Sequence, residues 1–219
     1  MNEWKNVDDF LLGTIIRQDD ALLHALKTSR ENDLPEWEVS PEQGQFLYIL
    51  AKMKGAKRIL ELGTLGGYST IWLGYAIPKD GKIISLEFNQ NYAKIAKENI
   101  DYAGLTDKVT IIEGNAVDTM KNLIEHNEEP FDMIFIDADK PNNPLYLELA
   151  LKLSKKGTVV FGDNVVREGH LADTDSTDPK VQGVRKYISD LGELSNITST
   201  AIQTVGCKGY DGFCLSIVE

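Results

Sequence analysis

The stretch Arg58-Ile-Leu-Glu-Leu-Gly-Thr-Leu-Gly-Gly-Tyr-Ser69 joins a short apolar run to a carboxylate and then to three glycines. The apolar residues around Glu61 are typical of a buried parallel strand. The glycines allow a tight turn in which the backbone can approach a ligand, and an amphipathic helix is predicted from Ser69 onward. Such a turn, at the carboxyl end of the first strand of an open α/β sheet, predicts a site for a nucleotide-like ligand.

The charge beside this turn indicates which ligand it is. The glycines, Gly63-x-x-Gly66-Gly67, do not fit the G-x-G-x-x-G pattern of NAD-binding proteins. Glu61 would repel a pyrophosphate, but it would attract the ammonium and sulfonium groups of S-adenosylmethionine. Glu87 ends the next apolar run, near the roughly 20-residue spacing expected for a carboxylate that holds ribose hydroxyls. We therefore expect S-adenosylmethionine as the cofactor.

The composition excludes some partners. The chain has 219 residues and a formal net charge of −11, which argues against non-specific binding to nucleic acid or to an anionic membrane. The acidic N-terminal residues are unlike a secretory signal, and no stretch approaches the length of a membrane span. A disulfide between Cys207 and Cys214 is conceivable, but reduced thiols are favoured. We therefore expect a cytoplasmic protein.

Strands and helices alternate along most of the chain. The predicted strands are 58–62, 82–87, 108–113, 131–137, 157–162, 197–206 and 212–218. The predicted helices are one or two within 5–28, one from Pro41 with Phe46, Leu47, Leu50 and Met53 buried, and then 68–77, 90–103, 116–126, 143–154 and 179–191. This alternation predicts an α/β fold, Rossmann-like, with a seven-stranded, mostly parallel sheet, one antiparallel edge strand and helices on both faces.

The whole chain, 1–219, is interpreted as one domain, because it contains neither an internal repeat nor an obvious linker. Residues 1–38 are expected to form an N-terminal helical cap. The polar connection 165–180 is long for a compact domain, and loops of that length are often lids. We therefore predict that 165–180 is a substrate lid.

Four carboxylates end predicted parallel strands: Glu61, Glu87, Asp137 and Asp163. Strands one, four and five would meet near the point where strand order reverses, which is where ligands bind in such sheets. Like charges there repel one another, so a cation is expected. Asp137, Asp163 and Asn164 supply hard oxygen ligands suited to Mg²⁺ or a similar ion. Helix capping by Asp137 and a turn at 163–164 are the structural alternatives.

Lys140 follows Asp137 by three residues and can face the same pocket. A neighbouring cation would favour its neutral amine, and the lysine could then act as a general base. The alternative for Lys140 is a solvated loop lysine.

Several motifs in order resemble those of the cation-dependent class I O-methyltransferases, the family of caffeoyl-CoA and catechol O-methyltransferases, in its bacterial small-chain branch. The resemblance runs from about Ser40 to the C-terminus. It rests on Glu42-Gln-Gly-Gln-Phe-Leu47, Glu61-Leu-Gly-Thr-Leu-Gly-Gly-Tyr-Ser69, Glu87, Glu113-Gly-Asn-Ala116, Asp137-Ala-Asp-Lys140 and Gly162-Asp-Asn-Val165.

The resemblance implies a methyltransferase fold and a role for each matching residue. The cofactor-binding residues would be Val39, Glu61, Gly63, Thr64, Ser69, Glu87, Ala116 and Asp137. The metal ligands would be Asp137, Asp163 and Asn164, with Mg²⁺, Mn²⁺ or Ca²⁺ as the ion, and Lys140 would be the catalytic base. The resemblance also implies a homodimer.

The implied function is the S-adenosylmethionine-dependent and metal-dependent methylation of a hydroxyl on a catechol-type phenol. Two departures fall on the substrate side. Asp-Asn-Tyr commonly follows the lysine in the family and is replaced here by Pro141-Asn142-Asn143, and the tryptophan that plant enzymes carry after the Asp-Asn pair is missing. The alternatives are a methyltransferase acting on a hydroxylated tRNA base, an NAD-dependent reductase and an inactive cofactor-binding protein.

Overall fold

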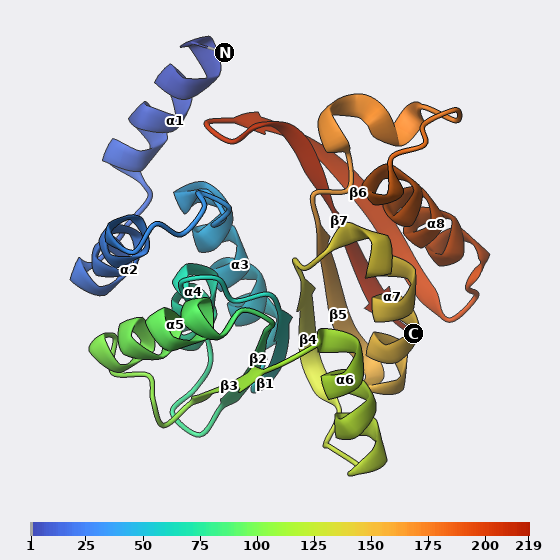
Figure 1. Cartoon of the computed structure of the whole chain (residues 1–219), viewed down its shortest axis with the longest axis horizontal. Coiled ribbons are helices and arrows are strands. Elements are labelled where there is room, and N and C mark those ends of the chain that lie inside the picture. The colour runs from blue at the N-terminus through green and yellow to red at the C-terminus, as the bar shows by residue number, and fades with distance from the viewer. Residues whose placement is uncertain (1) are drawn as a thin grey trace.

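The computed structural model describes residues 2–219, so Met1 of the predicted cap lies outside the described residues (Figure 1). The strands are β1 (Arg58–Leu62), β2 (Lys82–Glu87), β3 (Val109–Glu113), β4 (Phe131–Ile136), β5 (Ser154–Asp163), β6 (Ile197–Gly206) and β7 (Gly209–Val218). The helices are α1 (Asn2–Thr14), α2 (Asp20–Glu31), α3 (Pro41–Lys54), α4 (Tyr68–Ala76), α5 (Gln90–Tyr102), α6 (Ala116–Glu125), α7 (Asn143–Lys152) and α8 (Pro179–Glu193). Two short 3₁₀ helices are η1 (Lys140–Asn142) and η2 (Arg167–Ala172).

The strands form one seven-stranded sheet in the order β3-β2-β1-β4-β5-β7-β6. Neighbours from β3 to β5 are parallel, β7 is antiparallel to β5, and β6 is antiparallel to β7. The predicted Rossmann-like sheet with antiparallel pairing at one edge is confirmed. The reversed strand β7 lies between β5 and the edge strand β6.

Helices cover both faces of the sheet, with α3, α4 and α5 on one face and α6, α7 and α8 on the other (Figure 1). Alternate strand residues supply the two cores, because side chains along a strand point to opposite faces. Ile59 and Phe135 pack beneath α3 and α4, whereas Leu60 and Ile134 pack beneath α6 to α8. The sheet therefore has two buried faces, as expected for parallel strands.

The N-terminal residues form two helices, α1 and α2, outside the α3–α5 layer (Figure 1). The linker between them is held by α4: the Tyr68 hydroxyl donates to Gln18 Oε1 at 2.5 Å and the Tyr75 hydroxyl to Asp19 Oδ2 at 2.8 Å. The helical content of the predicted cap is present, while its action on substrate stays a prediction. Among the described residues, no helix combines the length and apolar character needed to cross a bilayer.

The buried face of α3 differs from the prediction at one residue. Leu47 is fully buried, but Met53 is 81% exposed. The buried positions are Gly44, Leu47 and Ala51, which follow the helical period. Met53 comes two residues after Ala51, about 200° further round the helix, so it points to solvent.

The connection predicted to be a lid contains the 3₁₀ helix η2 and begins with two buried residues, Val165 and Val166. Asp211 of β7 holds its start, because its Oδ1 accepts hydrogen bonds from the backbone N–H groups of Val166 and Arg167, both at 3.0 Å. The motion expected of a lid stays a prediction.

Candidate active site

The carboxyl ends of four neighbouring parallel strands bring the predicted site residues into one row. Leu62 of β1 pairs with Leu86 of β2 and with Ile136 of β4, and Ile136 pairs with Gly162 of β5. The residues that follow these pairs are Gly63, Glu87, Asp137 and Asp163, which therefore lie side by side along one rim of the sheet. The chain leaves β1 and β4 in opposite directions, so the rim includes the switch point at which α/β sheets bind ligands.

Glu61 is fully buried beneath the glycine turn. Three hydroxyls donate to its carboxylate: Ser69 Oγ to Oε1 at 2.7 Å, Thr70 Oγ1 to Oε2 at 2.5 Å and Ser85 Oγ to Oε2 at 2.6 Å. Burial raises the pKa of the Glu61 carboxyl, and the three hydroxyls partly oppose that rise. Glu61 thus fixes the start of α4, including the predicted cofactor residue Ser69. Its own contact with a cofactor stays a prediction.

The backbone of the turn requires glycine at position 63. Gly63 has φ of 90°, and a Cβ there would lie 2.2 Å from the carbonyl oxygen of Asp137. Its N–H donates to Leu86 O at 2.9 Å, which joins the turn to β2. The absence of a side chain thus allows the β1 turn and the end of β4 to touch.

Glu87 closes the other side of the turn. Its Oε2 accepts hydrogen bonds from Thr64 N at 3.2 Å and Leu65 N at 2.9 Å, and its Oε1 accepts one from Asn89 N at 2.9 Å. The carboxylate is 8% exposed, and each of its oxygens has two lone pairs, so it retains capacity to accept a further bond. This is compatible with the predicted contact to ribose hydroxyls.

Asp137 and Lys140 form an ion pair at the end of β4, with Lys140 Nζ donating to Asp137 Oδ1 at 2.9 Å. Lys140 is 7% exposed, so it is not a solvated loop lysine. Its predicted role as general base stays a prediction.

Asp163 at the end of β5 is held through both carboxylate oxygens. Asn164 N donates to Oδ1 at 2.8 Å and Gln43 Nε2, from α3, donates to Oδ2 at 2.7 Å. Burial and the negative charge of Asp137 raise the pKa of the Asp163 carboxyl to about 7, while the ammonium of Lys140 opposes the rise. Asn164 follows in a left-handed conformation, φ 54°, which Asn tolerates better than most residues.

The donor set fits a divalent cation. Asp137 and Asp163 follow paired residues of neighbouring strands, Asn164 is the next residue and carries an amide oxygen, and Lys140 is ion-paired with Asp137. A buried carboxylate whose pKa is raised by a second carboxylate lacks compensating positive charge, and a cation would supply it. Oxygen donors of this kind suit Mg²⁺, Mn²⁺ or Ca²⁺.

The turn fits a cationic cofactor. Residues 61–70 carry one carboxylate and no basic side chain, and Glu87 is bonded to the same backbone. A pyrophosphate would meet negative charge there, whereas a sulfonium would be attracted. Thr64, 2% exposed, bonds through its hydroxyl to that of Thr70 at 2.7 Å, so its side chain belongs to the turn itself.

Two predicted cofactor residues lie at the margins of the rim. Val39 is buried between α2 and α3 among residues that include Tyr68 and Trp72. Ala116 is the first residue of α6, half-buried, and follows the N-cap Asn115. The contacts of both residues with a cofactor stay predictions.

The polar groups that support these residues were not predicted from the sequence. Gln43, Thr70 and Ser85 each bond to a predicted site carboxylate from another element. Gln43 falls within the motif Glu42 to Leu47, but its spacing of 120 residues from Asp163 gives no local signal of the contact. Ser85 was detectable, because a serine inside a buried apolar strand needs a partner.

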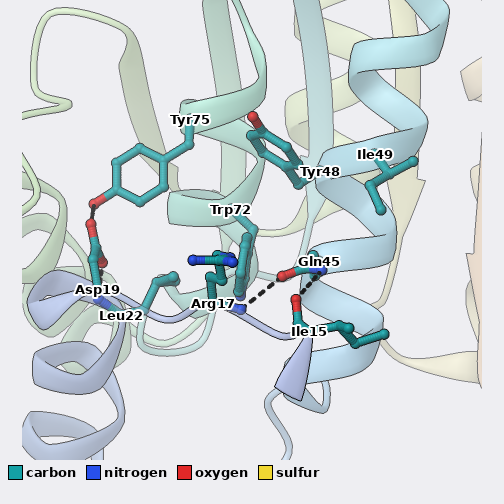
Figure 2. Close-up of a pocket in the computed structure, with 9 residues that line it drawn as sticks. All are labelled: Ile15, Arg17, Asp19, Leu22, Gln45, Tyr48, Ile49, Trp72 and Tyr75. Atoms are coloured by element: carbon teal, nitrogen blue, oxygen red, sulfur yellow. Dashed lines mark hydrogen bonds between the residues drawn. The ribbon is translucent and has the colours of Figure 1, made fainter. Parts of the chain in front are cut away.

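A cavity of about 440 Å³ lies elsewhere, between the α1–α2 linker, α3 and α4 (Figure 2). None of the predicted site residues lines it. We place the site at the strand rim, because the buried carboxylates, the ion pair and the glycine turn are there. The residues that line the cavity are Ile15, Arg17, Asp19, Leu22, Gln45, Tyr48, Ile49, Trp72 and Tyr75.

Comparisons with known proteins show the family to which the chain belongs. A family model described as O-methyltransferase matches residues 15–213. A catechol O-methyltransferase of Niastella koreensis is 47% identical over 216 residues, covering 99% of this chain and 98% of that protein. A catechol O-methyltransferase of Mycobacterium tuberculosis is 43% identical over 214 residues, covering 98% and 96%. The crystal structure of an O-methyltransferase from Bacillus cereus in complex with SAH has a TM-score of 0.98 to this chain at 46% identity, covering 100% and 99%.

Proposed function

Because this chain belongs to the O-methyltransferase family and is an S-adenosylmethionine-dependent enzyme, we propose that it methylates a hydroxyl of a catechol-type phenol with the help of a divalent cation. The observation that carries this proposal is the pair of carboxylates, Asp137 and Asp163, at the ends of neighbouring strands β4 and β5, beside the buried Lys140. The names of the Niastella koreensis and Mycobacterium tuberculosis relatives support the acceptor class. Family membership removes the NAD-dependent reductase as an alternative.

Two bound groups would supply the chemistry that side chains lack. S-adenosylmethionine brings a methyl group on positively charged sulfur, and SAH, as in the Bacillus cereus complex, is what remains after transfer. A divalent cation, Mg²⁺ first among candidates, would bring positive charge that favours ionisation of a catechol hydroxyl.

The residues of the rim would bind and orient the reactants. Asp137, Asp163 and Asn164 offer oxygen ligands, and Glu61 orients Ser69 beneath the cofactor turn. Glu87 would accept from ribose hydroxyls. Holding acceptor and methyl group in line can lower the barrier by about 7–11 kcal/mol.

Lys140 would accept the proton that the acceptor hydroxyl loses. The acceptor oxygen forms a bond to the methyl carbon as the carbon–sulfur bond breaks, and the phenol proton must leave. We assign that proton to the neutral amine form of Lys140, whose Nζ lies 2.9 Å from Asp137 Oδ1 and whose residue is 7% exposed. A positioned base of this kind typically contributes about 10²–10⁴ in rate.

The test is an assay with methyl-labelled S-adenosylmethionine and a panel of ortho-dihydroxy aromatics, run with Mg²⁺ and with EDTA in parallel. We expect label transfer to at least one catechol and its loss in EDTA. Transfer that EDTA does not reduce would remove the cation from the mechanism. Cofactor binding with no transfer to any catechol would remove the proposed acceptor class.

We also propose that the enzyme works as a homodimer. The edge strand β6 is exposed from residue 198 to 205, and α1 exposes Val7 and Phe10 at 57% and 69%. An uncovered edge strand and apolar residues on a neighbouring helix favour pairing with a second copy. A cytoplasmic location stays a prediction, compatible with the two free thiols at Cys207 and Cys214.

A further inference from the structure

Gln43 of α3 makes a contact that its local sequence does not predict. Ser40-Pro-Glu-Gln43 is a capping-box sequence, in which the glutamine side chain normally returns to the N-cap backbone. The first half of the box is present, because Ser40 Oγ accepts from Gln43 N at 3.2 Å. The side chain of Gln43, however, donates from Nε2 to Asp163 Oδ2 at 2.7 Å, 120 residues along the chain.

This bond completes the fixing of the Asp163 carboxylate. Asn164 N holds Oδ1 at 2.8 Å, and Gln43 holds Oδ2, so the plane of the carboxylate has a defined orientation at the end of β5. Each oxygen keeps a lone pair for another partner. Without Gln43, the backbone N–H of Asn164 would be the remaining donor that holds the carboxylate.

The identity of the donor group follows from the chemistry. An ionised carboxylate only accepts hydrogen bonds, so the amide nitrogen of Gln43, and not its oxygen, must face Asp163. Gln43 therefore presents a donor to one oxygen of Asp163 and fixes the orientation of the carboxylate.

We propose that Gln43 is a positioning residue for the cation site: it orients the Asp163 carboxylate, without touching the cation. This inference rests on the proposed cation dependence. Partners that hydrogen-bond to ligating carboxylates typically matter about 10- to 100-fold in metal affinity. The contact also ties the start of α3, directly after Val39, to the end of β5.

The matched control is on the same helix. Gln45 is two residues further along α3, and it faces the α1–α2 linker instead, where Gln45 Oε1 accepts from Arg17 N at 2.9 Å and Nε2 donates to Ile15 O at 3.2 Å (Figure 2). Gln43→Met and Gln45→Met remove the same amide and keep the side-chain length. The two variants therefore differ in which contact is lost.

The experiment titrates Mn²⁺ into the wild-type full chain and both variants, follows free Mn²⁺ by electron paramagnetic resonance, and measures SAH affinity by calorimetry. We expect Gln43→Met to weaken Mn²⁺ binding about 10-fold or more, with SAH affinity and melting temperature unchanged. Gln45→Met should bind Mn²⁺ as the wild type does.

Each other outcome overturns the proposal in a recognisable way. Equal Mn²⁺ affinity of Gln43→Met and wild type would show that Asp163 is oriented without Gln43, while leaving the cation site in place. Parallel losses of Mn²⁺ affinity, SAH affinity and melting temperature would show a structural role only, as would an equal loss in Gln45→Met. Failure of the wild type to bind Mn²⁺ would refute the cation site itself and this inference with it.

Discussion

Gly63 is the residue at which the backbone of the site is most constrained. An alanine there would combine a positive φ with a Cβ 2.2 Å from Asp137 O, so the turn and the end of β4 would have to separate. Left-handed strain costs roughly 1–2 kcal/mol and overpacking roughly 1–3 kcal/mol. We predict that Gly63→Ala lowers the free energy of unfolding by about 2–5 kcal/mol in urea denaturation.

Alanine substitutions at two other glycines separate backbone strain from steric clash as causes of this loss of stability. Gly209 has φ of 93° with nothing within 4 Å of a Cβ, so Gly209→Ala reports strain without a clash. Gly192, inside α8, has neither problem, and Gly192→Ala should stabilise by up to about 1 kcal/mol through helix propensity. If Gly63→Ala costs no more than Gly209→Ala, the close approach to Asp137 has no energetic weight.

Asp163 and Lys140 should differ in how much activity their loss removes. Asp163→Ala removes the proposed metal ligand, a residue that is 5% exposed and bonded through both oxygens, whereas Lys140→Ala removes the proposed base and leaves both carboxylates. We predict that Asp163→Ala nearly abolishes methyl transfer, while Lys140→Ala retains about 10⁻² to 10⁻⁴ of it. Single-turnover rates with a catechol acceptor measure both, and an unimpaired Asp163→Ala enzyme would contradict the role of the cation.

At the level of single residues, the sequence predicts the positions that follow directly from where a strand ends. Asp137 and Asp163 follow apolar runs, so their place on the rim was predictable from the pattern alone. The bonds of Glu61 to Ser85 and of Asp163 to Gln43 were not predictable, because they join separate elements whose distance is set by tertiary packing. Lys140 follows Asp137 by only three residues, so the sequence alone predicted that the two side chains face the same pocket.

Among the elements, the glycine turn, its strand and its helix were predicted closely, and the largest difference is at β5. Ser154 was predicted as the last residue of the helix 143–154, and residues 155–156 as the connection to the strand 157–162. In the structure, β5 begins at Ser154. Ser154 pairs with Phe131 of β4, with a register shift before Met133. Pairing with a distant strand extends β5 into polar residues that show no apolar pattern of their own.

The edge strand β6 is exposed from residue 198 to 205. Its sequence, residues 197–206, contains no charged residue, whereas protected edge strands usually carry charge or proline. We predict that Ile202→Lys, at a position 49% exposed, converts a dimer to a monomer in sedimentation velocity, because a buried lysine at a strand interface is costly. Asn122→Lys, on the exposed side of α6, should leave the dimer intact. A dimer that survives Ile202→Lys would place the interface elsewhere.

The molecule as a whole is acidic, with 34 Asp and Glu against 23 Lys and Arg. Four of these acids, Glu61, Glu87, Asp137 and Asp163, lie at the ends of neighbouring strands, and Lys140 is ion-paired with Asp137. Such a surface attracts cations and repels polyanions. The charge therefore supports a small phenol over the remaining alternative, a hydroxylated tRNA base.

We predict that the enzyme does not retain tRNA, even at about 50 mM salt, where electrostatic binding is strongest. A protein that binds RNA through lysine and arginine would show affinity that falls steeply between about 50 and 200 mM salt, because counterions are released from the phosphates. Fluorescence anisotropy of labelled tRNA at both concentrations measures this, with methyl transfer to a catechol run on the same preparation as the positive control. Retention with that salt dependence, together with label incorporated into tRNA and none into catechols, would reverse the choice of acceptor, because a local basic surface would then outweigh a net charge of −11.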